Sequence, residues 1–250
     1  MSGSSSPELA DESRPNNNLL RALREPDYAL IAPHLFTRDG GINDVLYNPG
    51  DNVEVVHFPL GPTLASFLVA GEDGRDVETV LVGREGAVGG IVSHGRLPAY
   101  TRIVVKFGGS FACLKVADLE AAKAKSNALR HYFARYADCL LAQIFQSTAC
   151  NAIHSIEQRA AKWMIAATER TGGDVVPFTH EELAAMLGAG RSHTTRVLQG
   201  FRSRGLVETR RGFLIVRDQP ALKLVACQCN ELVKMHFEEV LRGVYPSDGD

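Results

Sequence analysis

Residues 178–216 read FTHEELAAMLGAGRSHTTRVLQGFRSRGLVETRRGFLIV, and this stretch decides the fold of the C-terminal part of the chain. Thr179 and Glu182 have the spacing of a capping box, which predicts the start of a helix. Two glycines within residues 188–190 then permit the backbone angles of a sharp turn. Ser192 is expected to cap a second helix, so the segment is predicted to be a helix-turn-helix.

A short hairpin is expected after the second helix. Gly205 ends that helix, and Leu206–Thr209 and Phe213–Val216 have the composition of two strands whose connection carries Arg210 and Arg211. The whole segment is therefore predicted to be a winged helix-turn-helix.

The segment is basic although the chain is not. Residues 180–217 contain seven arginines and three glutamates, an excess of four positive charges, whereas the formal net charge of the chain is -2. Such local basic charge is typical of a surface that binds the phosphates of double-stranded DNA. The side chains expected to contact DNA are Thr179, Arg191, Ser192, His193, Thr195, Arg196 and Arg211.

Length and composition limit what the remainder can be. With 250 residues, 45% of them hydrophobic and 22% charged, the chain has room for two modest domains. It contains no run of about 18 apolar residues, so no membrane span or membrane partner is expected. Residues 1–18 are rich in Ser, Pro and Asn and lack an apolar signal core, which predicts a disordered tail on a cytoplasmic protein.

The cysteines indicate a reducing compartment, because their number is odd and they are scattered, at positions 113, 139, 150, 227 and 229. Pro220 is expected to open one last helix that carries both Cys227 and Cys229. Residues two apart on a helix point to nearly opposite sides, so these two thiols are not expected to bind one ion. No metal and no cofactor are therefore predicted.

Residues 19–118 are predicted to form an antiparallel β-roll of the jelly-roll type. Short segments rich in Val, Ile, Phe and Thr alternate with turn residues and have no helix between them. These segments are 45–47, 53–58, 63–69, 77–82 and 102–107. Residues 83–101 contain five glycines, which serve either a close approach to phosphate or the steric needs of the roll itself.

Residues 119–153 are predicted to form a long central helix with a hinge at its end, at residues 151–154. Its apolar residues recur at spacings of three and four, and they are more than a small roll can cover. Pairing with a second copy in a homodimer is predicted, and packing on its own roll is the alternative. The predicted interface consists of Leu129, Phe133, Tyr136, Leu140 and Ile144. Residues 154–250 then form the DNA-binding unit with its C-terminal helix.

This order of elements resembles the CRP/FNR superfamily of bacterial transcription regulators, an α+β architecture. The most specific stretches are THEELAAMLG (179–188), RSHTTRVLQGFRSRGLVETRRGFLIV (191–216), SIEQRAAKW (155–163) and VGREGAVGG (82–90). The resemblance implies a sequence-specific transcription regulator, not an enzyme, that binds a near-palindromic DNA site as a homodimer. It also allows RNA polymerase and an unidentified small-molecule effector as partners.

The effector side of the resemblance differs from members that bind cyclic AMP. Their Gly-Glu and Arg-Ser pairs correspond to Gly89-Gly90 and to residues 98–100 here, so control by cyclic AMP is not expected. Ser192 also stands where many members carry Glu, so a different operator is expected. The residues expected around another effector are Arg84, Gly89, Gly90, Arg96, Tyr100, Arg102, Ile144 and Phe145.

Two other functions are compatible with parts of the sequence. An architectural DNA-binding protein would share the basic helix-turn-helix but would show little sequence preference. A metal-dependent β-roll enzyme would need clustered ligands, whereas His34, His57 and His94 are isolated. The last two are expected on the surface of the roll.

Overall fold

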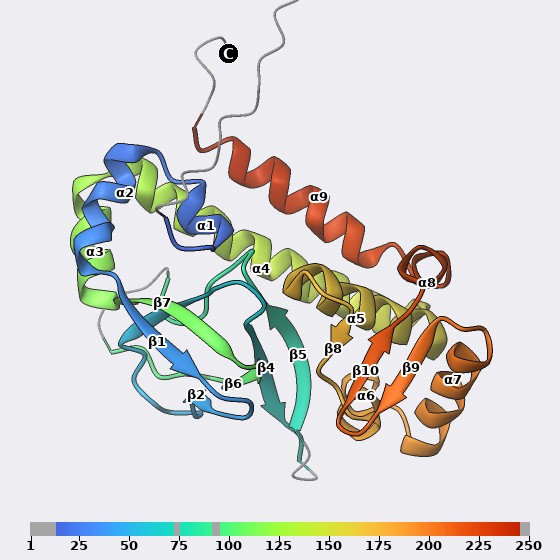
Figure 1. The fold of residues 1–250 in the computed structure, drawn as a ribbon. Helices are drawn as coiled ribbons and strands as arrows, with labels where there is room; N and C mark the ends of the chain where they lie inside the picture. The colour runs from blue at the N-terminus through green and yellow to red at the C-terminus, as the bar shows by residue number, and fades with distance from the viewer. Residues whose placement is uncertain (1–13, 73–75, 92–95, 246–250) are drawn as a thin grey trace, which may run out of the picture.

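A β-roll, a long helix and a C-terminal helical unit follow one another along the chain in the computed structural model, which describes residues 14–72, 76–91 and 96–245 (Figure 1). Before the roll lie α1 (Asn18–Arg21), α2 (Glu25–Ile31) and the short 3-10 helix η1 (Ala32–His34). Among the described residues, no helix is long and apolar enough to span a bilayer.

The roll has two antiparallel sheets. Its strands are β1 (Phe36–Gly40), β2 (Val45–Tyr47), β3 (Val55–Pro59), β4 (Leu64–Ala70), β5 (Asp76–Val82), β6 (Arg102–Phe107) and β7 (Gly109–Lys115). One sheet has the order β1-β7-β3 and the other β2-β6-β4-β5. The five predicted strands are confirmed, whereas β1 and β7 were not predicted. Most of β1 is exposed and polar, and β7 begins inside the Gly-Gly turn.

The last residues of the predicted disordered tail are in fact packed on the roll. The Asn17 side chain caps α1, where its oxygen accepts hydrogen bonds from the backbone N–H groups of Leu19 and Leu20. Its amide donates to the carbonyl groups of Pro59, at 3.1 Å, and Gly86, at 2.8 Å. The prediction is therefore wrong for residues 14–18, and residues 1–13 lie outside the described residues.

Two helices occupy the range in which one central helix was predicted, α3 (Val116–Lys125) and α4 (Asn127–Ile153). Ser126 between them has an extended backbone, and its hydroxyl caps α4 by accepting a hydrogen bond from the Leu129 N–H. The same hydroxyl donates to Asp27 of α2. A continuous helix from residue 119 is therefore wrong, because the break at Ser126 lets α3 turn away.

Most of the predicted dimer stripe is covered by the chain itself. Leu129, Phe133 and Tyr136 are fully buried in the core that α4 shares with the roll, and Leu140 is partly buried there. A second copy was predicted to cover Leu129, Phe133 and Tyr136, and this prediction is wrong. The first half of α4 packs on its own roll, which was the alternative. Ile144 is 42% exposed.

The C-terminal unit consists of α5 (Ile156–Thr171), β8 (Val175–Val176), α6 (His180–Leu187), α7 (Arg191–Ser203), β9 (Val207–Arg210), β10 (Phe213–Val216) and α8 (Gln219–Val225). Its sheet has the order β8-β10-β9. The helix α5 lies at the centre, with every residue from Arg159 to Thr168 buried. Its neighbours in the core include Phe178, Leu183, Leu198 and Phe201.

The predicted single C-terminal helix is also wrong. α8 ends at Val225, and α9 (Cys229–Arg242) begins after a short connection. α8 packs on α5, whereas α9 leaves the helix-turn-helix and lies along α4 (Figure 1). The Phe237 ring of α9 meets the Tyr136 ring edge-on at a centroid distance of 6.2 Å. Cys227 thus lies in the connection, and it does not share a helix with Cys229.

His57 is not a surface residue of the roll, because only 2% of it is exposed. Its ring lies between those of Tyr47 and Phe111, at centroid distances of 5.7 and 5.9 Å. Burial, with the positive charge of Arg38, lowers the pKa of His57 to about 4. His94 lies outside the described residues.

We predict that His57 makes the fold sensitive to acid. Between pH 6.5 and 4 the unfolded chain binds a proton at this residue and the folded chain does not, so stability falls as the pH falls through this window. Between pH 7 and pH 4, the free energy of unfolding should fall by about 3 kcal/mol more in the wild type than in His57→Gln. Urea unfolding of both proteins at each pH measures it, and a difference that does not change with pH would contradict the assignment.

Candidate nucleic-acid interface

The first helix of the helix-turn-helix begins as predicted. The Thr179 backbone N–H donates to the Glu182 carboxylate at 2.8 Å, and the Glu182 N–H donates to the Thr179 hydroxyl at 3.1 Å. These reciprocal bonds confirm the capping box and start α6 at His180. Gly188 ends α6 at φ +58°, a left-handed backbone that favours glycine.

Glu182 also connects α6 to the roll. Its carboxylate lies 3.2 Å from the ammonium of Lys106 on β6, which lies 3.2 Å from the carboxylate of Glu78 on β5. Burial raises the pKa of Glu78 above its ordinary value. For Glu182, burial also acts to raise the pKa, but the Thr179 N–H and the Lys106 charge outweigh it and leave the pKa lowered. The helix-turn-helix is thus held against the roll by one cation shared between two carboxylates.

The second helix, α7, begins earlier than predicted. Gly190 is its N-cap and Arg191 its first residue, so Ser192 stands in the first turn and the prediction that it caps the helix is wrong. Gly190 has no side chain, so no side-chain hydrogen bond caps this end of the helix. The free N–H groups at this end suit an anion such as a DNA phosphate.

The two faces of α7 differ in chemistry. Thr194, Leu198 and Phe201 are buried against the rest of the unit. The opposite face is exposed and carries four of the residues predicted to contact DNA, Arg191, Ser192, His193 and Arg196. Gln199 shares this exposed face and was not predicted, although its spacing of three from Arg196 would have found it.

Thr195 is placed differently from its neighbours. It is half-buried, and its hydroxyl lies 3.4 Å from the Nδ1 atom of His180 on α6. Burial and the charge of Arg191 lower the pKa of His180. Thr195 therefore holds the two helices together, while Thr179, which was also predicted to contact DNA, is exposed at the start of α6.

The wing is the hairpin of β9 and β10, which turns through Gly212 at φ +87°. Arg210, the last residue of β9, and Arg217, just after β10, both pair with Glu208. Arg211 at the tip is exposed and pairs with no carboxylate in the part of the chain that the structure describes. Its charge is therefore available to a phosphate.

The structure does not bring the eight predicted effector residues together. Arg84 lines a cavity of about 620 Å³ between α1, α4, α5 and α9. Arg102 pairs with Asp76 at 3.0 Å on the roll surface, and Arg96 and Tyr100 are exposed. These side chains thus belong to separate surfaces.

The remaining four predicted effector residues either pack inside the roll or face solvent. Gly89 has φ +114°, and a Cβ there would lie 2.4 Å from the Val55 carbonyl oxygen. Gly90 packs against side chains of the roll interior. Ile144 and Phe145 lie on the exposed side of α4. The two glycines therefore serve the steric needs of the roll, which was the alternative explanation for the glycine-rich loop.

Comparison with known proteins agrees with this architecture. Residues 158–225 match the family model of the Crp-like helix-turn-helix domain. FixK2 of Bradyrhizobium japonicum aligns with a TM-score of 0.65 at 13% identity, covering 77% of this chain and 98% of that one. A CRP-family transcriptional regulator of Thermus thermophilus aligns with a TM-score of 0.63 at 17% identity, covering 76% and 96%. The chain has the fold of the CRP/FNR regulators.

A third structure of similar fold is that of CLP from Xanthomonas campestris, described as a c-di-GMP responsive global regulator. It aligns with a TM-score of 0.61 at 15% identity, covering 78% of this chain and 100% of that one. No curated protein matches the chain in sequence. At these identities the likeness concerns the CRP/FNR fold, and the Crp-like helix-turn-helix domain is matched by its own family model.

We predict that Arg196 and Arg211 contribute differently to DNA binding. Arg196→Ala should cost about 1 to 3 kcal/mol and relax specificity at one base pair, because Arg196 lies on the exposed face of α7. Arg211→Ala should weaken binding to every sequence and reduce the salt slope by about 1. Fluorescence anisotropy at several salt concentrations measures both effects.

Arg204→Ala is the matched control, because the Arg204 guanidinium is already paired with Glu157 at 2.6 Å. It should leave affinity and salt slope nearly unchanged. Equal losses for all three variants would contradict the distinct roles.

Proposed function

We propose that this protein is a transcription regulator of the CRP/FNR type that binds a near-palindromic double-stranded DNA site as a homodimer. The exposed N-terminal part of α7 is the observation that carries the proposal, because it presents Arg191, Ser192, His193 and Arg196 beside free helix N–H groups. In this proposal, residues 19–118 are a sensor, α4 is the dimerisation helix, and the DNA-binding unit begins at residue 154.

The homodimer is proposed to form through an exposed patch in the C-terminal half of α4. Leu141, Ile144 and Phe145 are 49%, 42% and 68% exposed, and their spacing places them on neighbouring positions of one helix. A second copy of the same patch would cover them about a two-fold axis. The interface is thus shifted by about two helical turns from the stripe that the sequence suggested.

Control by cyclic AMP is not part of this proposal. The Tyr136 side chain packs against the glycine-rich loop. Its hydroxyl accepts a hydrogen bond from the Ala87 N–H at 2.7 Å and donates one to the Ala87 carbonyl at 2.9 Å. A Cβ at Gly86 would lie 2.3 Å from the Tyr136 hydroxyl. These contacts support a loop that packs on α4 instead of a loop that cradles phosphate.

Selection from random duplex DNA at fixed near-physiological salt, without any effector, tests the proposed function. Enrichment of a two-fold symmetric motif would support a sequence-specific dimer. Tight binding without enrichment would favour the second candidate, an architectural DNA-binding protein, since the basic wing alone provides only sequence-independent contacts. Absence of any binding in this assay would contradict effector-independent DNA recognition.

We predict that the double variant Ile144→Glu, Phe145→Glu is monomeric, because it places four like charges in the proposed two-fold interface. Sedimentation velocity at a fixed concentration measures the change. Leu224→Glu is the matched control, since Leu224 is 89% exposed on α8, away from α4. A double variant that stays dimeric would show that the interface lies elsewhere.

A further inference from the structure

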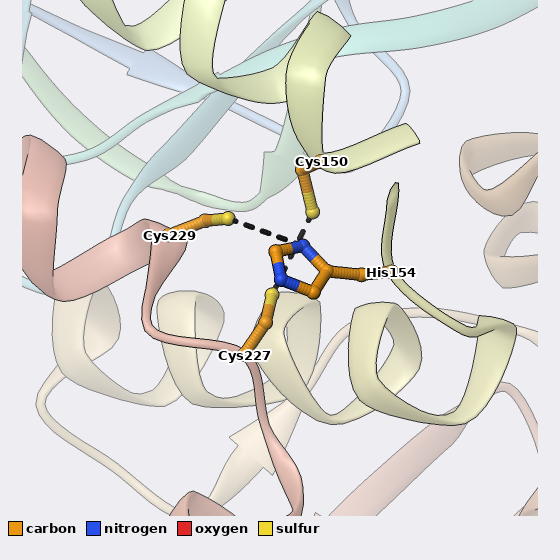
Figure 2. A group of neighbouring side chains, drawn as sticks. All are labelled: Cys150, His154, Cys227 and Cys229. Carbon is orange, nitrogen blue, oxygen red and sulfur yellow. Dashed lines mark hydrogen bonds between the residues drawn. The ribbon is translucent and has the colours of Figure 1, made fainter. Parts of the chain in front are cut away.

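Four side chains of metal-binding type meet where the central helix ends. Cys150 lies in the last turn of α4, His154 follows that helix, Cys227 lies between α8 and α9, and Cys229 begins α9. Figure 2 shows the three sulfur atoms and the imidazole ring directed toward one another. Segments separated by more than 70 residues thus supply one compact group.

The distances suit a single ion. The Sγ atoms of Cys150 and Cys227 are 3.6 Å apart, and the Cys229 Sγ lies 3.5 Å from the His154 Nδ1. All four potential ligand atoms lie within 4.8 Å of one another. A tetrahedral zinc ion with ordinary Zn–S and Zn–N bonds needs its ligand atoms roughly 3.6 to 3.8 Å apart. An iron-sulfur cluster distributes its ligands over several irons, so it needs a wider arrangement.

The local backbone explains how the residues converge. Cys150 and His154 are four apart, so they lie on one side of the chain as α4 ends, with the His154 N–H still bonded to the Cys150 carbonyl at 3.1 Å. The break between α8 and α9 frees Cys227 from helical geometry, which removes the reason for expecting the two C-terminal thiols to point apart.

The surroundings suit a closed site. The three cysteines are buried as a cluster of their own, and His154 is half-buried. The Gln146 amide donates to the Cys229 sulfur at 3.2 Å, a contact of the kind that orients metal ligands. Closed Cys₃His sites are a common form of structural zinc site.

The charge balance points in the same direction. A zinc ion with three thiolates and a neutral imidazole carries a charge of about -1. Lys162 of α5 is buried, and it lines the same small pocket as Cys229. One buried ammonium would therefore neutralise the loaded site.

We propose that Cys150, His154, Cys227 and Cys229 form a tetrahedral zinc site that fastens the hinge at the end of α4 to the connection between α8 and α9. The ion joins the dimerisation helix of the proposed regulator to the DNA-binding unit and to the helix that returns along α4. It thereby fixes the angle at which α5 and the helix-turn-helix leave the central helix. The presence of the site does not depend on the proposed function.

Metal analysis of the full chain, purified without chelator, is the first test. The expected result is one zinc per chain, retained by Cys113→Ser and Cys139→Ser, which remove buried thiols outside the cluster. Cys227→Ser and Cys229→Ser should each lower the zinc content and the affinity at least tenfold. Far-UV circular dichroism confirms that each variant is folded.

Cobalt(II) titration of the reduced, metal-free chain provides the second readout. It should produce the intense d–d and thiolate-to-cobalt bands of a tetrahedral site, and zinc should displace them. The ligand-preserving variant His154→Cys should still bind cobalt(II), with stronger thiolate bands. Zinc should also raise the melting temperature of the wild type by several degrees and leave that of Cys227→Ser unchanged.

Three results would overturn the proposal. One is a folded, reduced chain that holds no zinc and shows no tetrahedral cobalt spectrum. Another is zinc that Cys227→Ser and Cys229→Ser retain at wild-type affinity. The third is a chain isolated with visible iron-sulfur absorbance, or with a Cys150–Cys227 disulfide that persists under reducing purification. Loss of zinc without loss of DNA binding would leave the proposed function intact, so the two proposals fail separately.

Discussion

The coverage of α4 is the constraint on which the rest of the structure depends. The helix has 27 residues, and no single neighbour covers its whole length. The roll buries its first half, where the Tyr136 hydroxyl is bonded to the backbone of Ala87 inside the glycine-rich loop. The helix α9 covers another side through Phe237, and Leu141, Ile144 and Phe145 remain exposed. A second copy is proposed to cover these exposed residues, and a zinc ion is proposed to bind at the C-terminal end of the helix.

Two further contacts determine where the DNA-binding unit lies relative to the roll. Lys106 shares its charge between Glu78 and Glu182, and Arg170 of α5 pairs with Glu85 at 2.6 Å. Glu182 also caps α6, so the same side chain starts the helix-turn-helix and holds it against the roll. Buried ion pairs of this kind add little net stability but are costly to break on one side, so they favour one arrangement of the two units. A change that separates Glu182 from Lys106 would release α6 from the roll.

The sequence predicted the winged helix-turn-helix well because its signals are local. The capping box at Thr179 and the left-handed Gly188 and Gly205 follow from neighbouring residues alone. Some local signals were misplaced, such as the helix cap expected at Ser192, but other predictions failed because they concern contacts between distant segments. The periodicity of Leu129 and Phe133 indicates a buried helix face, but it cannot say whether the roll or a second copy buries it. Likewise, Cys150 and Cys227 are separated by 77 residues, and no spacing rule joins them unless the break before α9 is known.

In the proposed dimer, two copies of α7, related by a two-fold axis, read two half-sites of one DNA duplex. A spacing series on a symmetric site tests this claim most directly, because it changes the geometry without changing any base contact. Inserting about five base pairs between the half-sites rotates one by half a turn, and we expect affinity to fall by about tenfold or more. Inserting about ten base pairs restores the shared face and should recover part of the loss. Equal affinity for all three spacings would contradict dimeric recognition.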